Sequence, residues 1–171
     1  MRNIVLIGLP GSGKTLLGRQ LANRLSLPFL DLDEWIEAQT GLRIPQIFSG
    51  YGEPFFRELE AHAVNEAACN PGQIVATGGG TILRPENTRA LRKHGVLIFI
   101  DRPAGQILAD IDPATRPLLA AAPEQLYEIE RTRRPLYLAA ADYILDCTAP
   151  PAGVLSNLLQ LIQQERVEVQ V

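Results

Sequence analysis

A glycine-rich segment near the start of the chain has the residue types and spacing of a phosphate-binding loop. Residues 8–15 read GLPGSGKT, which matches the pattern G-x-x-x-x-G-K-[ST]. Glycines let the backbone turn tightly, so that successive N–H groups can point at phosphate oxygens. Lys14 can then reach the β- and γ-phosphates, and the Thr15 hydroxyl can ligate Mg²⁺. We expect ATP and Mg²⁺ to bind this loop through Gly11, Ser12, Gly13, Lys14 and Thr15.

Two carboxylates, Asp31 and Asp33, follow a short apolar segment at residues 28–32. If the chain is extended there, alternate side chains point the same way and lie about 6.5–7 Å apart. Such a pair could divide the work of a phosphoryl transfer, with one carboxylate holding Mg²⁺ through water and the other accepting a proton from a hydroxyl. The alternative is that Asp33 only caps the helix that follows.

Three consecutive glycines and several arginines could bind an anionic acceptor. Gly78, Gly79 and Gly80 follow an apolar run, and glycines at such a place let a ligand approach the backbone closely, although a plain flexible turn is the alternative. A guanidinium group binds carboxylates and phosphates with two parallel hydrogen bonds, but most arginines are only solvated surface residues. The candidates are Arg57, Arg116, Arg133 and Arg134.

A phosphate-binding loop alone leaves several classes of protein open, namely ATPases, GTPases, kinases and regulatory nucleotide-binding proteins. The guanine-reading motif N-K-x-D is absent, which argues against a GTPase. A regulator that has lost turnover would be expected to lack Lys14, Asp33 or Arg116, and all three are present. We therefore expect a phosphotransferase.

The elements that position these residues alternate between strands and helices. We expect strands in the apolar segments at residues 3–8, 28–32, 74–76, 96–100 and 143–145. We expect the main helices at residues 16–25, 34–39, 54–69, 85–94, 124–141 and 154–166, with a short helix after Asp101. This order predicts an α/β fold with an open five-stranded parallel sheet and helices on both faces. Ligands bind such sheets beyond the carboxyl ends of the strands, where the glycine loop, the aspartates and the glycine triplet all fall.

Length and composition indicate one globular domain over residues 1–171, with 46% hydrophobic and 20% charged residues. A net charge of −3 gives no general attraction to nucleic acid, and no apolar run approaches the roughly 20 residues of a membrane helix. Cys69 and Cys147 lack metal-ligand spacing, and we expect both to be small core residues. A cytoplasmic monomer is expected.

Taken together, these segments resemble the shikimate kinase family. The matching segments are residues 8–15, FLDLD at 29–33, Phe56-Arg57 with Glu60, ATGGG at 76–80, RPLL at 116–119, and Arg133 with Leu136-Tyr137. The resemblance implies a P-loop kinase fold and ATP-dependent phosphorylation of the 3-hydroxyl of shikimate. It places the reaction in the pathway to chorismate and aromatic amino acids. A kinase for another sugar acid, such as gluconate, is the alternative on the same fold.

The resemblance also implies roles for individual residues. Asp33 would polarise the accepting hydroxyl. Asp31 and Thr15 would bind Mg²⁺, and Lys14 would bind the phosphates. The residues that would hold shikimate are Arg57, Arg133, Gly78, Gly79 and Gly80. The spacing of the family motif selects Arg133. Arg134 should not share its role, because neighbouring residues on a helix point about 100° apart.

A lid is expected over residues 112–123, and its Arg116 would neutralise the transferring phosphoryl group and contact the nucleotide. Because the segment is rich in Ala and Pro and has few large apolar residues, we expect it to be mobile without ligands. The family usually has an arginine over the adenine, at a position that is Ala109 here, and Asp110 and Asp112 follow it. We therefore expect weak ATP binding, and a lower KM for ATP after Asp110→Arg.

Overall fold

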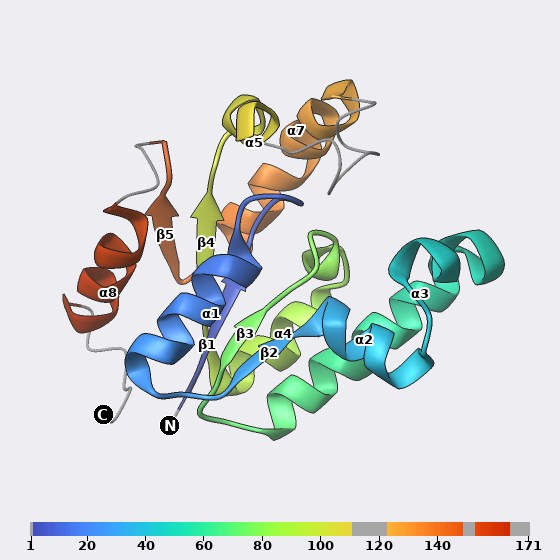
Figure 1. Cartoon of the computed structure of the whole chain (residues 1–171), viewed down its shortest axis with the longest axis horizontal. Helices are drawn as coiled ribbons and strands as arrows, with labels where there is room; N and C mark the ends of the chain where they lie inside the picture. Colours follow the sequence, from blue (N-terminus) through green and yellow to red (C-terminus); the bar gives the residue numbers. More distant parts are fainter. Residues whose placement is uncertain (1, 111–122, 149–152, 165–171) are drawn as a thin grey trace.

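Five parallel strands form a single sheet in the order β2-β3-β1-β4-β5 (Figure 1). The computed structural model describes residues 2–110, 123–148 and 153–164. The strands are β1 (Asn3–Ile7), β2 (Phe29–Asp31), β3 (Ile74–Ala76), β4 (Gly95–Asp101) and β5 (Tyr143–Asp146). The predicted five-stranded parallel sheet is thereby confirmed. The proposed lid, with Arg116 and Asp112, lies outside the described residues except for Pro123.

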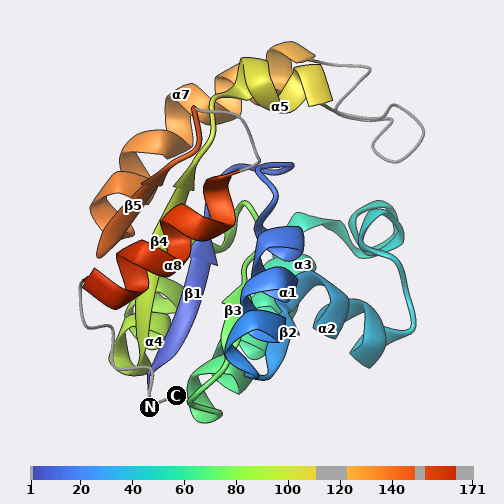
Figure 2. The same ribbon diagram turned by 60° about the vertical axis from the view of Figure 1, so that its left-hand side comes forward.

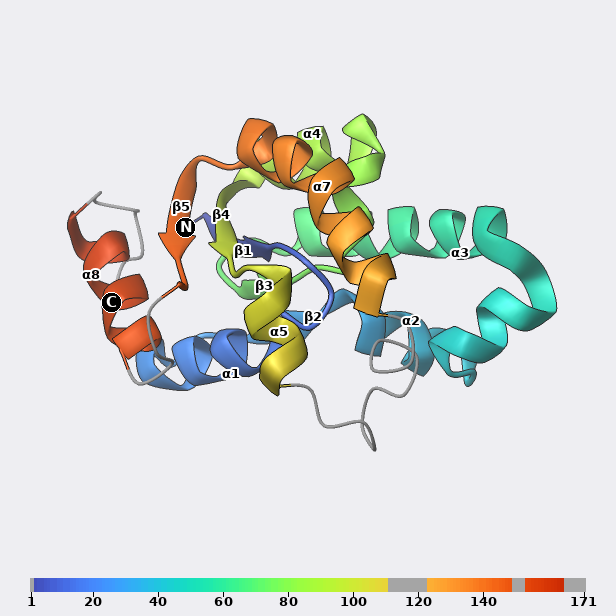
Figure 3. The same ribbon diagram turned by 90° about the horizontal axis from the view of Figure 1, so that it is seen from above.

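Helices cover both faces of the sheet (Figures 2 and 3). One face packs against α1 (Lys14–Leu25) and α8 (Val154–Gln164), and the other against α3 (Ile44–Cys69), α4 (Pro85–His94) and α7 (Pro123–Ala140). Successive side chains of a strand point to opposite faces, so Ile4 and Leu6 of β1 join one core while Val5 and Ile7 join the other. This burial on both faces explains why β1 and β4 are nearly continuous apolar runs.

The helix α3 begins ten residues earlier than the sequence predicted, at Ile44 in place of residue 54. Gly52 interrupts it with φ 81° and ψ 171°, and Pro54 follows. Both residues are helix breakers, so the sequence pattern reads them as a helix start. The upstream turns form nonetheless, because the Gln46 side chain accepts a hydrogen bond from the Arg43 backbone N–H (2.8 Å) and caps the first turn.

In the described part of the chain, the two glycine-rich loops that carry candidate functional residues leave the carboxyl ends of strands. The phosphate-binding loop follows β1, which is the central strand, and the glycine triplet follows β3. The short helix α5 (Ala104–Asp110) lies beyond the end of β4, whereas α2 (Leu32–Thr40) and the first turns of α3 lie on the β2 side (Figure 1). None of the helices in the described part of the chain is long and apolar enough to cross a membrane.

Candidate active site

The phosphate-binding loop adopts a conformation that only glycine tolerates easily. Gly11 has φ 80°, and Gly13 has φ 94° at the residue before helix α1. The loop therefore ends at a helix N-terminus, whose free N–H groups and dipole favour an anion. Lys14 is buried, with its Nζ 2.9 Å from the Gly8 carbonyl oxygen and 2.8 Å from that of Leu9. Its positive charge is thus held inside the loop, where phosphate oxygens would lie.

Asp31 joins the loop to the next helix. Its Oδ2 accepts a hydrogen bond from the Thr15 hydroxyl at 2.6 Å, and its Oδ1 accepts from the backbone N–H groups of Asp33 (2.9 Å) and Glu34 (3.3 Å). Asp31 is therefore the N-cap of α2, and the alternative that Asp33 caps this helix is wrong. Hydroxyl and carboxylate oxygens are ligands that Mg²⁺ accepts, so Thr15 and Asp31 fit the predicted metal site.

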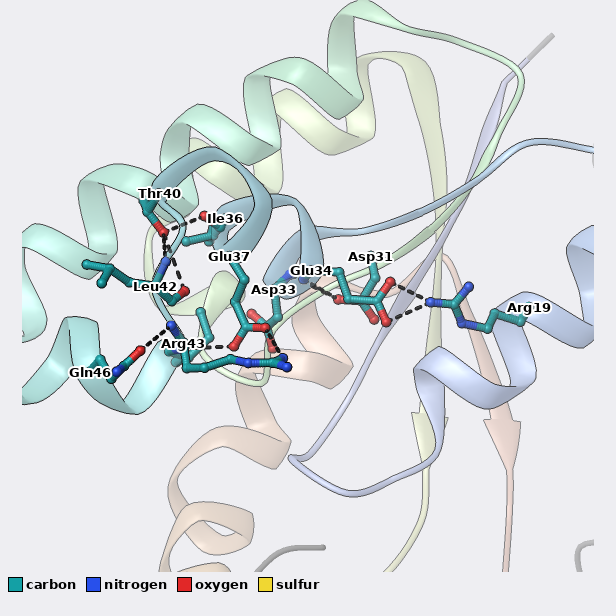
Figure 4. A network of polar contacts seen from close by, with 11 residues as sticks. Arg19, Asp31, Asp33, Glu34, Ile36, Glu37, Thr40, Leu42, Arg43 and Gln46 are labelled. Atoms are coloured by element: carbon teal, nitrogen blue, oxygen red, sulfur yellow. Dashed lines mark hydrogen bonds and ion pairs between the residues drawn. The ribbon is translucent and has the colours of Figure 1, made fainter.

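Asp33 lies in the first turn of α2, so the expected extended spacing of the two aspartates is wrong (Figure 4). The physical reason is the cap itself, because the bonds from Asp31 Oδ1 start the helix directly after β2. The carboxylate of Asp33 instead faces the glycine triplet: a Cβ on Gly78 would lie 3.0 Å from Asp33 Oδ1. The helix, not an extended strand, aims this carboxylate.

The environment of Asp33 favours its protonated form. Burial, and then the negative charge of Asp31, raise the pKa of Asp33 to about 6, with smaller contributions from Glu60 and Glu37. The charge of Lys14 opposes this shift. A carboxylate whose pKa lies nearer to neutrality is a better proton acceptor than an ordinary one. The site therefore has a suitable base for deprotonating a hydroxyl.

Side chains from other elements contact each residue of the glycine triplet. Arg133 Nη1 donates to the Gly79 carbonyl oxygen at 3.1 Å, and a Cβ on Gly80 would lie 2.6 Å from Arg57 Nη2. A side chain at residue 80 would meet the Arg57 guanidinium, and one at residue 79 would meet the Pro10 ring, so these glycines are closely packed and do not form a plain flexible turn. The structure thus brings Asp33, Arg57 and Arg133 to one short stretch of backbone.

Arg134 has a different environment from its neighbour. Its Nη2 lies 2.6 Å from Asp101 Oδ2 and its Nε lies 3.1 Å from Asp101 Oδ1, at the end of β4. The prediction from helical spacing that the two arginines point apart is confirmed. Arg133 is the one that reaches the glycine triplet.

Glu60 belongs to the site, although no role was expected for it from the sequence. Its side chain is 1% exposed, and it accepts hydrogen bonds from Arg57 Nη1 (2.8 Å) and the Thr81 hydroxyl (2.7 Å). Burial disfavours the charge of Arg57, but hydrogen bonds to Glu60 and Glu53 outweigh it and raise the Arg57 pKa. Glu60 lies three residues after Arg57 in α3, and this helical spacing could have identified the pair.

Tyr137 also belongs to the site, although no role was expected for it from the sequence. It holds the backbone of the glycine triplet at Gly79. Its hydroxyl donates to the Gly79 carbonyl oxygen, and its ring stacks on Phe99 with centroids 5.1 Å apart. Burial raises the pKa of Tyr137 to about 12, against the opposing charge of Arg133, so the hydroxyl remains a donor. The family motif includes this residue, but its role could not be predicted locally, because its partner lies 58 positions away in the sequence.

A pocket of about 430 Å³ opens beside the phosphate-binding loop at Ser12 and Gly13, on the β4–β5 side. Most of its walls are apolar, and the remaining polar lining includes Arg102, Gln106 and Asp110. Its size and composition suit the base of a nucleotide. Cys147 is buried in this wall as expected, but Cys69 is exposed near the end of α3, so the prediction of two core cysteines is half wrong. Cys69 lies at the last, solvent-facing position of its helix.

The parallel sheet has a phosphate-binding loop after its central strand, an apolar pocket on one side and two arginines with a base on the other. This arrangement defines a P-loop kinase that acts on a small anionic molecule.

Comparison with known proteins identifies the family. The family model for shikimate kinase matches residues 10–163. A shikimate kinase from Ralstonia nicotianae is 40% identical over 166 residues, which cover 95% of this chain and 87% of that protein. The solved structure of a shikimate kinase from Acinetobacter baumannii in complex with shikimate has a TM-score of 0.89 and 36% identity, covering 98% of this chain and 96% of the other. The chain therefore belongs to the shikimate kinase family.

A gluconokinase from Sinorhizobium meliloti has a TM-score of 0.57 and 14% identity, over 99% of this chain and 98% of that protein. It shares the fold alone. The expected fold and the expected kinase family are both confirmed by these comparisons.

Proposed function

We propose that this chain transfers the γ-phosphoryl group of ATP to the 3-hydroxyl of shikimate, giving shikimate 3-phosphate and ADP in the pathway to chorismate. The observation that carries the proposal is the convergence of Asp33, Arg57 and Arg133 on residues 78–80. Shikimate offers a carboxylate and neighbouring hydroxyls, which such a combination of two cations and one base can bind and activate.

On the acceptor side, Arg57 and Arg133 bind the carboxylate and orient the ring. Glu60 holds the Arg57 guanidinium, and Tyr137 holds the backbone of Gly79 that Arg133 contacts. The accepting oxygen forms a bond to the γ-phosphorus as the bond from that phosphorus to the ADP oxygen breaks. The hydroxyl proton passes to Asp33 and then to solvent.

On the donor side, the backbone N–H groups of the loop at Gly11, Ser12 and Gly13 bind the phosphates, and Lys14 places its charge at the β- and γ-phosphate oxygens. Thr15 and Asp31 would hold Mg²⁺, which supplies positive charge to the phosphates when it is bound. Arg116, which lies outside the described residues, would complete the charge stabilisation from the lid. Catalysis in this proposal rests on positioning and charge.

The acceptor is tested by measuring ADP release from ATP and Mg²⁺ with shikimate, with gluconate and with no acceptor. We expect release with shikimate alone, and a product that phosphorus NMR identifies as a monoester. Lys14→Ala should cost on the order of 10²-fold or more in kcat with the fold intact, because it removes the charge held in the loop. Equal turnover of gluconate, or none with either acid, would reject shikimate as the acceptor.

The proposed site uses residues of one chain, so we propose that the enzyme acts as a monomer. We also propose that it acts in the cytoplasm. Sedimentation at the working concentration tests the first point, since a stable dimer would contradict it. Cell fractionation followed by assay of shikimate-dependent ADP release tests the second.

A further inference from the structure

The pocket beside the phosphate-binding loop contains one ion pair in its otherwise largely apolar wall. Arg102 follows β4, and Asp110 ends helix α5 eight residues later. Arg102 Nη2 donates to Asp110 Oδ2, and the side chains are 18% and 56% exposed. Both residues line the pocket, and Arg102 is the only cationic residue among the described residues of this lining.

The position of the pocket determines which part of a nucleotide it would receive. Ser12 and Gly13 of the phosphate-binding loop form its edge, so a nucleotide with its phosphates in the loop would extend its base into this space. Leu16, Ile100 and Val154 supply apolar surface for a flat aromatic ring. The Gln106 amide donates to the Thr148 carbonyl oxygen at 2.8 Å and ties α5 to the segment after β5. The pocket is thus bounded by helix α5, which the ion pair connects to the end of β4.

We propose that Arg102, held in place by Asp110, is the cationic group that faces the nucleobase and contributes to nucleotide affinity in this chain. A guanidinium near the face of an aromatic ring is attracted by its π electrons, and partial burial strengthens this attraction. Asp110 orients the guanidinium and neutralises part of its charge, so it is a positioning residue. The inference rests on the proposed function, because it assumes that the phosphates occupy the loop.

This assignment reverses one expectation from the sequence. Asp110 was expected to weaken ATP binding by its negative charge, so that Asp110→Arg would lower the KM for ATP. In the structure the Asp110 carboxylate is paired with Arg102, and an arginine in its place would repel that guanidinium. We therefore expect Asp110→Arg to raise the KM for ATP.

The test separates contacts to the base from contacts to the phosphates. Arg102→Met keeps a long unbranched side chain but removes the cation, and calorimetry measures the binding of ADP and of inorganic tripolyphosphate to the wild type and the variant. We expect Arg102→Met to weaken ADP binding by about 3- to 30-fold, in line with a cation–π contact, and to leave tripolyphosphate binding unchanged. The KM for ATP should rise while that for shikimate stays nearly constant. The matched control is Arg89→Met, which removes an exposed ion pair on α4 and should change none of these values.

Two outcomes would overturn the proposal. Equal weakening of ADP and tripolyphosphate would make Arg102 a phosphate contact, and unchanged binding of both would make its pair with Asp110 purely structural. Arg102→Lys retains the charge and provides a folded comparison if the methionine variant is unstable. It should bind ADP more tightly than Arg102→Met, and equal loss in a folded lysine variant would count against a cationic role.

The role of Asp110 is tested by replacing it in the wild type and in the Arg102→Met variant. Asp110→Asn should weaken ADP binding in the wild type, because the guanidinium loses its anchor, and should have no further effect in the Arg102→Met background. A full additional loss there would mean that Asp110 contacts the nucleotide itself. If ADP binds as expected but shikimate gives no turnover, the proposed acceptor fails while the assignment of Arg102 stands.

Discussion

The catalytic role proposed for Asp33 would oppose stability at this residue. Its carboxylate is buried beside Asp31, and these two effects on its pKa outweigh the attraction of the Lys14 charge. Ionisation of Asp33 is therefore less favourable than that of an ordinary carboxylate, although a proton acceptor must be ionised to work. The free energy of unfolding should therefore increase when Asp33 is replaced by a residue that does not ionise.

The first prediction concerns the stability of Asp33→Asn. The pKa of Asp33 is about 6 in the folded protein, above its ordinary value of 3.8, so the folded state binds this proton more tightly than the unfolded chain does. Stability from this group is present at low pH and is lost as pH rises from about 4 to about 6. Asparagine does not ionise, so the variant should be more stable above pH ~6, by about 2–3 kcal/mol at most, and the difference should shrink towards pH ~4.

Urea unfolding across this pH range measures the effect, with EDTA present so that no bound metal ion shifts the pKa of Asp33. The same variant should lose roughly 10²–10⁴-fold in kcat, because it cannot accept a proton. If Asp33→Asn is less stable than the wild type at neutral pH, ionisation of Asp33 does not destabilise the folded protein.

The second prediction separates two adjacent arginines. Arg133→Ala should raise the KM for shikimate, with a loss of about 2–5 kcal/mol in binding, because a bound carboxylate is left without its partner. Arg134→Ala should leave this KM nearly unchanged, since Arg134 pairs with Asp101 away from the triplet. Steady-state kinetics of both variants decides the matter, and the reverse result would contradict the register of helix α7.

At the scale of elements, the break in α3 depends on one glycine. Gly52 has φ 81°, whereas Gly50 two residues earlier lies in regular helix. A Cβ on Gly52 would meet no close atom except Pro54 Cδ at 3.7 Å, so its requirement is conformational and not steric. The break separates the first turns of α3 from the turns that carry Arg57.

The third prediction uses these two glycines as a matched pair. Gly52→Ala should lower the free energy of unfolding by about 1–2 kcal/mol, because alanine is strained at positive φ. Gly50→Ala should raise it by up to about 1 kcal/mol, since alanine favours a regular helix and has open space there. Urea unfolding of the two variants measures both changes. Equal effects would indicate that residue 52 does not need a positive φ.

At the scale of the whole molecule, the phosphate-binding loop and the glycine triplet contact each other directly. The phosphate-binding loop follows β1 and the glycine triplet follows β3, and the ring of Pro10 lies directly on Gly79. A Cβ on Gly79 would be 2.7 Å from Pro10 Cδ and 3.0 Å from the Pro10 backbone nitrogen. The donor loop and the acceptor loop therefore cannot move apart or together without changing this contact.

The fourth prediction follows from that contact. Gly79→Ala should shift the phosphate-binding loop and the backbone bonded by Arg133 together, and should lower kcat/KM for both ATP and shikimate by at least roughly 10-fold. Gly50→Ala serves again as the control. An effect on only one substrate would mean that the two loops adjust independently.

The sequence by itself predicted the five strands and located the phosphate-binding loop by its motif. The pattern G-x-x-x-x-G-K-[ST] lies within eight consecutive residues, and the apolar runs of β1 and β4 report their burial directly. Helical spacing also predicted that Arg133 and Arg134 point apart, and the family motif selected Arg133. These predictions succeeded because each depends only on the spacing of residues that are close in the chain.

Only the tertiary structure decided how the acceptor side and the base pocket are built. Asp33 reaches Gly78 because Asp31 starts a helix, Tyr137 bonds a carbonyl 58 positions away, and Arg102 faces a pocket assembled from three separate segments. Hydrogen bonds and burial between residues far apart in the chain depend on how the sheet stacks its strand ends, and no local pattern records that order. The same long-range packing sets the pKa of Asp33, since burial is its largest cause.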